Sequence, residues 1–558
     1  MHINWASSVK IAFLSTINDS AIGQSRLHGS LLGGLPALCV HLVLDNFAQT
    51  LSVTLTLVIA YRYVVLQRDD LPELNPRKPY ELTNHRRVHE FVQNSKQLLA
   101  KGRELYKQKP YKLMSEWGSV VVLPPEQIDE LKSDPRMDFE TPTTDDSHGY
   151  IKGFDALNAD PSVTRVVTKY LTKALSKQLS EFTEIFSNDK LTGPISHEAA
   201  VATREVLGTH PDWREIYPAK DLLQLVARMS TRVFLGEEMC QNHEWIEASS
   251  QYAALAFSVG DNLRIYPRTF RPLVHWFMPS CWELRRSLRR CREILKPYIK
   301  SRKSLARTTD EQGNPLTFDD SIEWFERELG PNHDAALKQV TLSVVAIHTT
   351  TDLLLQTMSD LAQNPEVLQA VREEVIQVLG SEGLTKISLH GLKLMDSALK
   401  ESQRLRPTLL GSFRRQATRD IKLKNGFILK KGTRVVVDST HMWHPDYYPD
   451  PLRYDGFRFY NKRNTPGEDK NTLLVSTSAN HLGFGHGVHA CPGRFFASNE
   501  IKIALCHIIL NYEWRLPDGF KPQPLHLGMT YLSDPAIRMS VKPRKPEIDI
   551  ERLASQAA

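Results

Sequence analysis

The sequence predicts a mainly α-helical protein with small β-sheets, and three observations support this fold class. The run from Asp334 to Gln363 contains neither proline nor glycine, and at about 1.5 Å per residue it would form one helix of roughly 45 Å. Further helical patterns recur along the chain, whereas extended patterns are few. The helical patterns cover 85–106, 365–380 and 391–406, and the extended patterns cover 117–123 and 420–438. A helix this long belongs at the centre of a large domain, and 558 residues can enclose a sizeable buried cofactor.

Local signals support the helices. In 85–106, apolar residues fall on one helical face, among them Val88, Phe91 and Leu98. The pattern over 365–380 opens with a proline, which is favoured in the first turn of a helix, and closes on a glycine. The pattern over 391–406 ends before a proline, which predicts a helix boundary there.

The extended runs and loops are marked in the same way. In 420–438, extended residues flank Asn425-Gly426, the strongest short signal for a tight β-hairpin turn. The stretch WGSVVVL at 117–123 predicts a strand that ends at a double proline. The polar run TPTTDDSHG at 141–149 predicts a loop.

The N-terminal part differs from the rest of the chain. From Phe47 to Leu66 the sequence FAQTLSVTLTLVIAYRYVVL supplies about the twenty residues of a membrane-crossing helix, and Arg62 near its end can reach the interface. A cationic flank follows, which predicts a cytoplasmic main domain and a luminal N-terminus. The flank comprises Arg68, Arg77, Lys78, Arg86 and Arg87. The alternative is a buried helix of the main domain.

Five segments are predicted on this basis. They are a luminal or interfacial segment at 1–45, a transmembrane anchor at 46–66, a proline-rich hinge at 67–80, the main domain at 81–545 and a C-terminal tail at 546–558. In this topology Asn18, in Asn-Asp-Ser, would be a glycosylation acceptor.

The composition excludes several classes of binding partner and of structural site. The net charge of +6 is too small over this length to indicate a nucleic-acid binder, so we expect small molecules, proteins or membrane as partners and no nucleic acid. The six cysteines include no CxxC pair, which argues against a disulfide framework and against a structural zinc ribbon.

One cysteine stands in an unusual setting. Cys491 lies in FGHGVHACPGRFFA, with glycines on both sides and Pro492 opening a predicted helix, so the thiol lies at a helix N-terminus that favours thiolate. Four interpretations are open: a zinc site with His486 and His489, a nucleophile with His489 as base, a buried cysteine that only packs, and a thiolate ligand of haem iron.

Three elements, taken in order, favour the haem interpretation. The pattern F-x-x-G-x-[RH]-x-C-x-G is filled by Phe484, Gly487, His489, Cys491 and Gly493. Upstream, Glu401 and Arg404 form an i,i+3 pair on one helical face, and Arg458 in YDGFRF can be a second partner for the same carboxylate. Over about residues 75 to 545 the chain resembles the cytochrome P450 superfamily, the haem-thiolate monooxygenases.

The resemblance implies a cytochrome P450 fold with one N-terminal transmembrane helix and a haem b cofactor. Cys491 would be the axial iron ligand. His489 would replace a more usual arginine near a haem propionate. Glu401, Arg404 and Arg458 would form a buried ion network that stabilises the core.

The long helix would supply the residues on the other face of the haem. Its VVAIHTTTD stretch matches the family's A-G-x-[DE]-T-T segment with Thr350 in register, which makes the Thr350 hydroxyl the catalytic candidate. Ile347 replaces the glycine and Thr349 replaces the acid, so the proton route stays open among His348, Asp352 and water. The alternative is that these threonines only bond back to helix carbonyls.

The family's Trp-x-x-x-Arg propionate contact is absent, since no tryptophan lies between Trp117 and Trp213. Arg165 or Lys169 would take its place. After the helix that carries Glu401, Arg414 or Arg415 would supply another propionate contact. The candidates carried forward are Lys169 and Arg415.

The segments LNPRKPYELTN, LKESQRLRP and HACPGRFFASNEIK are similar to those of fungal membrane-bound P450s of secondary metabolism, including ent-kaurene oxidase and terpenoid hydroxylases. This resemblance implies a monooxygenase at the endoplasmic reticulum membrane, with the catalytic domain in the cytoplasm. It would oxidise a lipophilic terpenoid with O2 and electrons from NADPH-cytochrome P450 reductase, which Arg494 and Lys502 would help to dock. The alternatives are a polyketide or alkaloid substrate, an O2-independent haem-thiolate isomerase or dehydratase, and a non-catalytic haem sensor.

Overall fold

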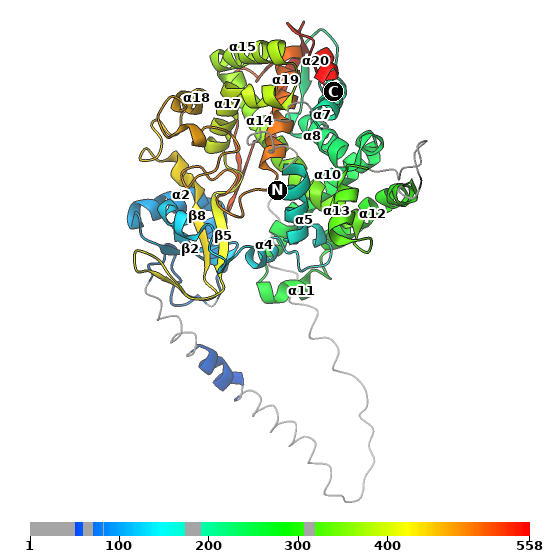
Figure 1. Cartoon of the computed structure of the whole chain (residues 1–558). Coiled ribbons are helices and arrows are strands. Elements are labelled where there is room, and N and C mark those ends of the chain that lie inside the picture. Colours follow the sequence, from blue (N-terminus) through cyan, green and yellow to red (C-terminus); the bar gives the residue numbers. More distant parts are fainter. Residues whose placement is uncertain are drawn as a thin grey trace, which may run out of the picture. The chain divides into compact units, whose positions relative to one another are not determined.

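The structure is a computed structural model, and it describes residues 49, 51–59, 71–81, 83–172, 191–305, 308 and 318–557 (Figure 1). The chain divides into two units, residues 1–70 and 71–558. In the first unit, residues 51–59 are helical. Among the helices that the described residues form, none combines the length and the apolar character needed to cross a membrane. The rest of the predicted anchor at 46–66, the segment 1–45 and Asn18 lie outside the described residues.

The second unit is mainly helical with small sheets, as the sequence predicts (Figure 1). Its longer helices are α2 (His85–Tyr106), α7 (Thr192–Leu207), α8 (Pro218–Leu235), α10 (His243–Arg264), α12 (Pro279–Leu305), α13 (Ser321–Leu329), α14 (Ala335–Gln363), α15 (Pro365–Glu382), α17 (Lys393–Leu405), α19 (Arg494–Asn511) and α20 (Ile550–Ala557). Short helices are α3 (Ile128–Leu131), α4 (Glu140–Asp146), α5 (Pro161–Val166), α9 (Glu237–Cys240), α11 (Arg271–Val274), α16 (Lys386–Gly391) and α18 (Arg458–Lys462), and Val167–Thr172 (η3) is a π-helical turn.

Helix α14 confirms the long helix predicted over 334–363. The Asp334 side chain caps its start by accepting the Leu337 N–H at 3.0 Å, and it ends at Gln363, before Asn364-Pro365. Helices α8, α10 and α17 pack against it, and side chains such as Leu354 and Met358 are fully buried there. α14 therefore forms the centre of the main hydrophobic core.

The strands form one larger sheet and three small ones. The five-stranded sheet has the order β1-β2-β8-β5-β3, with β2 and β8 parallel and the other neighbours antiparallel. The strands are β1 (Tyr111–Ser115), β2 (Gly118–Leu123), β3 (Met137–Asp138), β4 (Arg214–Ile216), β5 (Gly411–Ala417), β6 (Ile421–Lys422), β7 (Ile428–Leu429), β8 (Arg434–Asp438), β9 (Tyr512–Arg515), β10 (Leu525–Leu527), β11 (Thr530–Leu532) and β12 (Met539–Pro543). The predicted hairpin is present as β6 and β7 around Gly426 at φ +86°, whereas β8 leaves it and joins the larger sheet.

The predicted loop at 141–149 is partly wrong, because α4 covers most of it. The Asp138 carboxylate accepts the N–H groups of Glu140 and Thr141 at 2.9 and 3.4 Å, which satisfies donors at the start of the helix. The buried Asp145 and Asp146 then pair with Arg434 of the larger sheet. Contacts with a distant strand thus hold a polar run in helical form.

Two predicted boundaries also shift. α15 continues past Gly380 to Glu382 and ends at Gly383, where φ is +68°. Residues 71–80, predicted as part of the hinge, belong to the larger unit: the Asn75 Nδ2 donates to the Met114 carbonyl and the Met114 N–H donates back to Asn75 Oδ1, both at 2.9 Å. The predicted tail at 546–558 contains α20, whose Ile550 and Ala554 are buried.

Candidate active site

Cys491 lies in a tight loop that leads into α19. Its N–H donates to the Phe484 carbonyl at 2.8 Å, and the Ala490 N–H donates to the Gly487 carbonyl at 3.0 Å. These bonds close the loop around the sulfur. All four of these residues belong to the stretch that the sequence singled out.

Two neighbours clamp this loop. Gly487 has φ +83°, and a Cβ added there would lie 2.5 Å from the Lys132 carbonyl oxygen, just after α3. A Cβ at Gly483 would lie 2.1 Å from the Gln403 side chain on α17. Gly487 therefore requires glycine for its backbone angle, whereas a side chain at Gly483 would have to displace the Gln403 side chain.

The histidines of the loop contact other side chains. His486 contacts Asp129 Oδ1 at 3.2 Å and Thr477 Oγ1 at 3.1 Å. His489 is exposed and stacks on the Phe139 ring, with 5.0 Å between centroids. Within the described ranges no three His, Cys, Asp or Glu side chains come together as a metal site, so the zinc interpretation finds no ligand set there.

The start of α19 faces the sulfur, although not as the sequence predicts. Gly493 is the N-cap and the helix begins at Arg494, so Pro492 precedes the cap instead of lying in the first turn. Burial raises the pKa of the Cys491 thiol, while the backbone N–H groups of Gly493 and Arg494 act to lower it. The Arg494 Nη1 donates to the Cys491 carbonyl at 2.8 Å, which fixes the junction of loop and helix.

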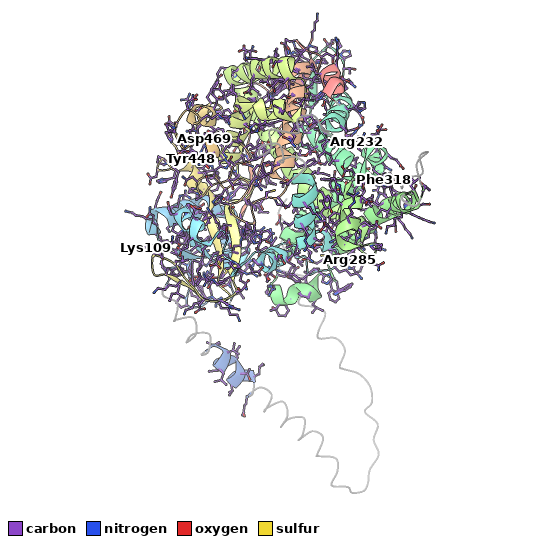
Figure 2. The ribbon with its side chains drawn as sticks, in the orientation of Figure 1. Lys109, Arg232, Arg285, Phe318, Tyr448 and Asp469 are labelled. Atoms are coloured by element: carbon purple, nitrogen blue, oxygen red, sulfur yellow. The ribbon has the colours of Figure 1, made fainter. Side chains whose placement is uncertain are left out.

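The structure brings Glu401, Arg404 and Arg458 together in a buried network. Arg404 donates from Nε and Nη2 to the two Glu401 oxygens, both at 2.8 Å, and Arg458 Nε donates to Glu401 Oε1 at 3.0 Å. The Glu401 and Arg404 side chains are fully buried. Arg404 also lies 4.9 Å from the ring centroid of Tyr448. Figure 2 labels Tyr448. The network therefore joins α17, α18 and the loop that carries Tyr448.

In the middle of α14, Thr350 differs from the threonines beside it. Thr349 Oγ1 donates to the Val345 carbonyl at 2.9 Å, and Thr351 Oγ1 donates to the Ile347 carbonyl at 2.8 Å. Thr350 is buried, and its hydroxyl makes no hydrogen bond within the described part of the chain. Back-bonding to the helix therefore accounts for Thr349 and Thr351 but not for Thr350.

The cationic residues predicted to contact a haem propionate differ in whether they already form an ion pair. Arg415 is buried and forms no ion pair with any described residue; its guanidinium lies 4.9 Å from the Phe139 ring, the ring on which His489 stacks. Burial, followed by the charge of Arg414, lowers the pKa of Arg415 to about 10. Arg414 instead pairs with Asp146 at 3.4 Å.

Lys169 is not brought to the cysteine loop. It is largely exposed and pairs with Glu328 at the end of α13. From the same segment it is Thr172 that reaches the loop, since its Oγ1 donates to the Pro492 carbonyl at 2.5 Å. The structure thus groups Arg415 and His489 around Phe139 and leaves Lys169 apart.

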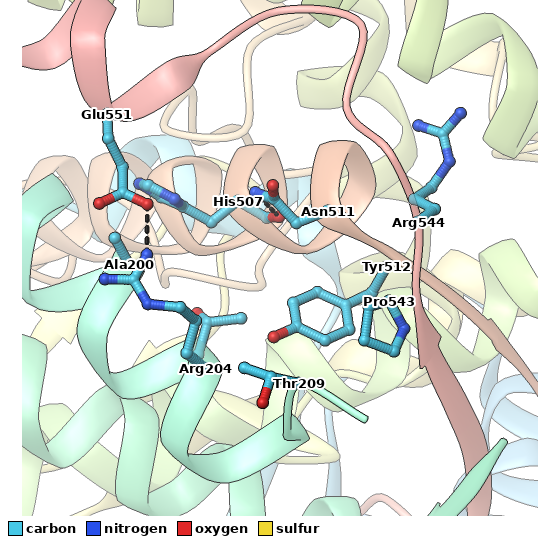
Figure 3. A pocket seen from close by; sticks show the side chains of 10 residues that line it. Ala200, Arg204, Thr209, His507, Asn511, Tyr512, Pro543, Arg544 and Glu551 are labelled. Atoms are coloured by element: carbon cyan, nitrogen blue, oxygen red, sulfur yellow. Dashed lines mark hydrogen bonds and ion pairs between the residues drawn. The ribbon is translucent and has the colours of Figure 1, made fainter. Parts of the chain in front are cut away.

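A separate pocket lies between α7, α19 and the C-terminal segment (Figure 3). Arg204 pairs with Glu551 across it, and the Tyr512 hydroxyl donates to the Gly208 carbonyl at 2.9 Å. Neither Cys491 nor Thr350 lines this pocket. It is distinct from the site built around the cysteine loop.

A family model described as Cytochrome P450 matches residues 80–541. The chain belongs to the cytochrome P450 family. The cytochrome P450 monooxygenase eqxH of Fusarium heterosporum is 45% identical over 87% of this chain and 92% of its own length. The cytochrome P450 monooxygenase hepE of Aspergillus oryzae is 40% identical over 85% of this chain and 86% of its own length, and TRI1 of Fusarium sporotrichioides is 35% identical over 88% of each.

Solved structures agree on the fold of this P450. The crystal structure of the cytochrome P450DA heme domain superposes with a TM-score of 0.59 at 17% identity, over 85% of this chain and 98% of that one. Retinoic acid-bound cyanobacterial CYP120A1 superposes with a TM-score of 0.58 at 18% sequence identity. The match covers 82% of this chain and 96% of that one. Because the chain belongs to the cytochrome P450 family and its relatives are monooxygenases, it is an oxidoreductase that uses haem b, O2 and a redox partner.

The residues present fit a haem. The Cys491 sulfur faces backbone N–H groups, which suit a thiolate ligand. Gly493, whose N–H faces the sulfur, has open space beside it, since a Cβ there would meet no heavy atom within 4 Å. Arg415 offers a buried cation of the kind that a propionate carboxylate would pair with. When bound, the haem supplies the iron that activates O2.

Three residues that contact the cysteine loop could not be predicted from the sequence. One residue predicted to help dock the reductase is also corrected. Phe139, Gln403 and Thr172 contact the loop from distant segments, and no local pattern marks them. Lys502 is buried in α19, where it donates to the Leu389 carbonyl at 2.8 Å. It is therefore not available to dock a reductase.

Proposed function

We propose that this P450 oxidises a lipophilic small molecule, a terpenoid intermediate of fungal secondary metabolism, using electrons from NADPH-cytochrome P450 reductase. The observation that carries the proposal lies on α14. Val345 is 53% exposed although it lies midway along the central helix, and Thr349, one turn on, is exposed as well. Open space beside a central helix, next to the free hydroxyl of Thr350, is where a substrate would be held against the reacting centre.

Apolar side chains support a lipophilic substrate. Leu525 and Leu527 of β10 remain exposed, and their hairpin is tied to α14 through Ser533, whose N–H donates to Asp352 Oδ1 at 2.8 Å. An apolar substrate site selects by shape, and one methylene changes binding by only about 1–3 kcal/mol. The exact terpenoid has to be found by product analysis.

The test co-expresses the full chain with a reductase and supplies panels of terpenoids, polyketides and alkaloids of similar size. We expect NADPH-dependent products from the terpenoid panel, with one added oxygen or a further oxidised carbon. Products from the polyketide or alkaloid panel alone would contradict the substrate class. Turnover without NADPH would instead favour the O2-independent isomerase or dehydratase.

Cys491 is proposed as the axial ligand, and it can be tested without a substrate. The reduced wild type should show the red-shifted Soret band of thiolate-ligated haem when carbon monoxide is added. Cys491→Ala should lose this band. Cys506→Ala, which removes a buried thiol on α19, is the matched control and should keep it. Retention of the band in Cys491→Ala would refute the assignment.

We further propose that the enzyme is held at the endoplasmic reticulum membrane by the helix predicted at 46–66, with the catalytic domain in the cytoplasm. A surface of the second unit supports contact with lipid. Large apolar side chains are exposed from the end of α10, through α11 at the edge of the unit in Figure 1, to the start of α12. They are Ile265, Tyr266, Phe270, Leu273, Trp276, Phe277 and Trp282. Arg285, labelled in Figure 2, lies 5.1 Å from the Trp276 ring, and aromatic rings beside cations favour a membrane interface.

Fractionation tests this location. The full chain should sediment with microsomes and resist carbonate extraction, whereas a chain without residues 1–66 should be released by carbonate. Recovery of the full chain in the soluble fraction would contradict the anchor. Glycosylation at Asn18 would appear as a mobility shift that endoglycosidase removes.

A further inference from the structure

Helix α12 carries a large excess of positive charge. Its acids are Glu283 and Glu293, whereas its lysines and arginines are Arg285, Arg286, Arg289, Arg290, Arg292, Lys296, Lys300, Arg302 and Lys303. Several of these cations are spaced four residues apart, and like charges at this spacing destabilise a helix. The excess therefore has a cost to the folded helix, and a partner of opposite charge would offset it.

The helix has one buried face and one outward face. Side chains spaced by three or four residues are buried on the inner face, where α12 packs against α10 and α14; they are Cys281, Leu284, Leu288, Cys291 and Leu295. Side chains with the same spacing lie on the opposite face and are all exposed; they are Trp282, Arg286, Arg289, Glu293, Lys296 and Lys300. We call Arg286, Arg289, Lys296 and Lys300 the cationic stripe.

The protein does not neutralise the cationic stripe. The arginines that flank it, Arg290 and Arg292, pair with acids of α10 and of the α14 cap at 3.6 and 2.7 Å. The four cations of the stripe form no ion pair with a described residue, and Glu293 is the one acid among the outward positions. The uncompensated charge thus lies on the side of α12 that faces away from the protein.

The cationic stripe continues the apolar surface that is proposed above to contact lipid. Trp282 belongs to that surface, is 57% exposed and lies one helical turn before Arg286 on the same face. Just before α12, Trp276 and Phe277 are exposed as well. From Trp282 to Lys300 the outward face extends for about 27 Å at 1.5 Å per residue. Exposed aromatic rings beside a cationic helix face are typical of segments that lie on an anionic membrane.

An electron donor fits the cationic stripe less well than a membrane does. Such a protein would dock near the cysteine loop, and the contacts of that loop come from Lys132, Phe139, Thr172 and Gln403. None of these residues lies on α12. The position of the stripe therefore favours lipid over the reductase as its partner.

We propose that the cationic stripe of α12 binds the anionic headgroups of phospholipids, so that the catalytic unit rests on a negatively charged membrane surface. The inference rests on the membrane location proposed above and adds a lipid preference to it. Each lysine or arginine close to such a surface changes binding about fivefold. The attraction extends over about 8 Å at physiological salt, so only cations near the surface contribute.

The test measures how the full-length holoenzyme partitions into two kinds of vesicle by sedimentation. One kind is phosphatidylcholine alone, and the other is phosphatidylcholine and phosphatidylserine in a ratio of about three to one. The quantity of interest is the partition coefficient for the anionic vesicles divided by that for the neutral ones. A membrane anchor contributes to both coefficients and cancels in this ratio.

The double variant Arg286→Gln, Arg289→Gln should lower the ratio by about tenfold or more, because it removes two cations of the stripe. The matched control is Arg204→Gln, Arg538→Gln, which removes two charges from side chains that are 46% and 53% exposed and already form surface ion pairs. The control should keep the ratio within about twofold, since exposed pairs contribute little. The carbon monoxide spectrum reports that each variant retains its haem site.

Three results would overturn the proposal. One is an unchanged ratio in Arg286→Gln, Arg289→Gln. Another is an equal loss in the control, which would assign the preference to net charge. The third is weaker binding of the reductase by the double variant without a change in the vesicle ratio, which would make the stripe a protein docking face.

The anchor and the cationic stripe fail separately in this test. A wild-type chain that binds only the vesicles with phosphatidylserine would contradict the anchor and support the stripe. A wild-type chain that binds both kinds of vesicle equally would contradict the stripe and leave the anchor in place.

Discussion

Replacing Glu401 by glutamine tests the buried ion network at its centre. The carboxylate accepts from Arg404 Nε and Nη2, from Arg458 Nε and from the Asp455 N–H, at 2.8, 2.8, 3.0 and 3.2 Å. Glutamine keeps the shape but loses the charge, and its amide group would point donors at a guanidinium. Two buried cations would then face no anion. Breaking a buried pair in this way costs about 3–5 kcal/mol, or roughly 10²–10⁴ in the folding equilibrium.

The assay is urea unfolding of the holoenzyme, followed by loss of the Soret band. Glu323→Gln is the matched control, because Glu323 pairs with Arg327 at 2.9 Å on α13 with both side chains partly exposed. An exposed pair contributes about 0–1 kcal/mol, so this control should stay close to wild type. Equal losses in Glu401→Gln and Glu323→Gln would show that the network does not stabilise the core.

Further outcomes are expected at the cofactor site and in the core. Arg415→Met should release haem to an acceptor protein several-fold faster than Lys169→Met, because Arg415 is buried without an ion-pair partner among the described residues whereas Lys169 pairs on the surface; equal rates would remove Arg415 from the propionate contacts. Thr350→Ala should reduce NADPH-dependent product formation by about tenfold or more, and Thr351→Ala should not, since the Thr351 hydroxyl bonds back to Ile347 while the Thr350 hydroxyl has no hydrogen-bond partner among the described residues. Burial raises the pKa of Glu500 to about 8, so the folded state holds a proton that the unfolded state loses near pH 4.5. Stability should therefore fall by about 1.4 kcal/mol per unit as pH rises from about 4.5 to 8, and Glu500→Gln should remove this component, as chemical denaturation across pH would show.

Long-range contacts explain which parts of the fold the sequence predicts. α14 follows from the absence of helix breakers between Asp334 and Gln363, a property that is local to the segment. α4 does not, because its polar residues resemble a loop until Asp145 and Asp146 meet Arg434, which lies far along the chain. The exit of β8 from the predicted hairpin has the same cause, since its partners β2 and β5 lie outside it.

In the candidate site, too, some features can be predicted from consecutive residues and others depend on long-range contacts. The spacing of the cysteine loop and of the Glu401 and Arg404 pair is written in consecutive residues, and the structure brings these groups into the contacts that the spacing suggests. Local sequence does not show which cationic side chain is available to contact a haem propionate. Arg414 is neutralised by Asp146, whereas Arg415, its neighbour in sequence, has no such partner among the described residues, and only the tertiary structure distinguishes them.

The clamped cysteine loop has a practical consequence for protein engineering. Gly487 has a positive φ and lies against the Lys132 backbone, so libraries that vary this position should consist mostly of colourless protein. Val488, in contrast, directly follows Gly487 and is 67% exposed. Diversity introduced there would alter an exposed surface beside the cysteine loop without adding atoms at Gly483 or Gly487, which separates variation of that surface from assembly of the catalyst.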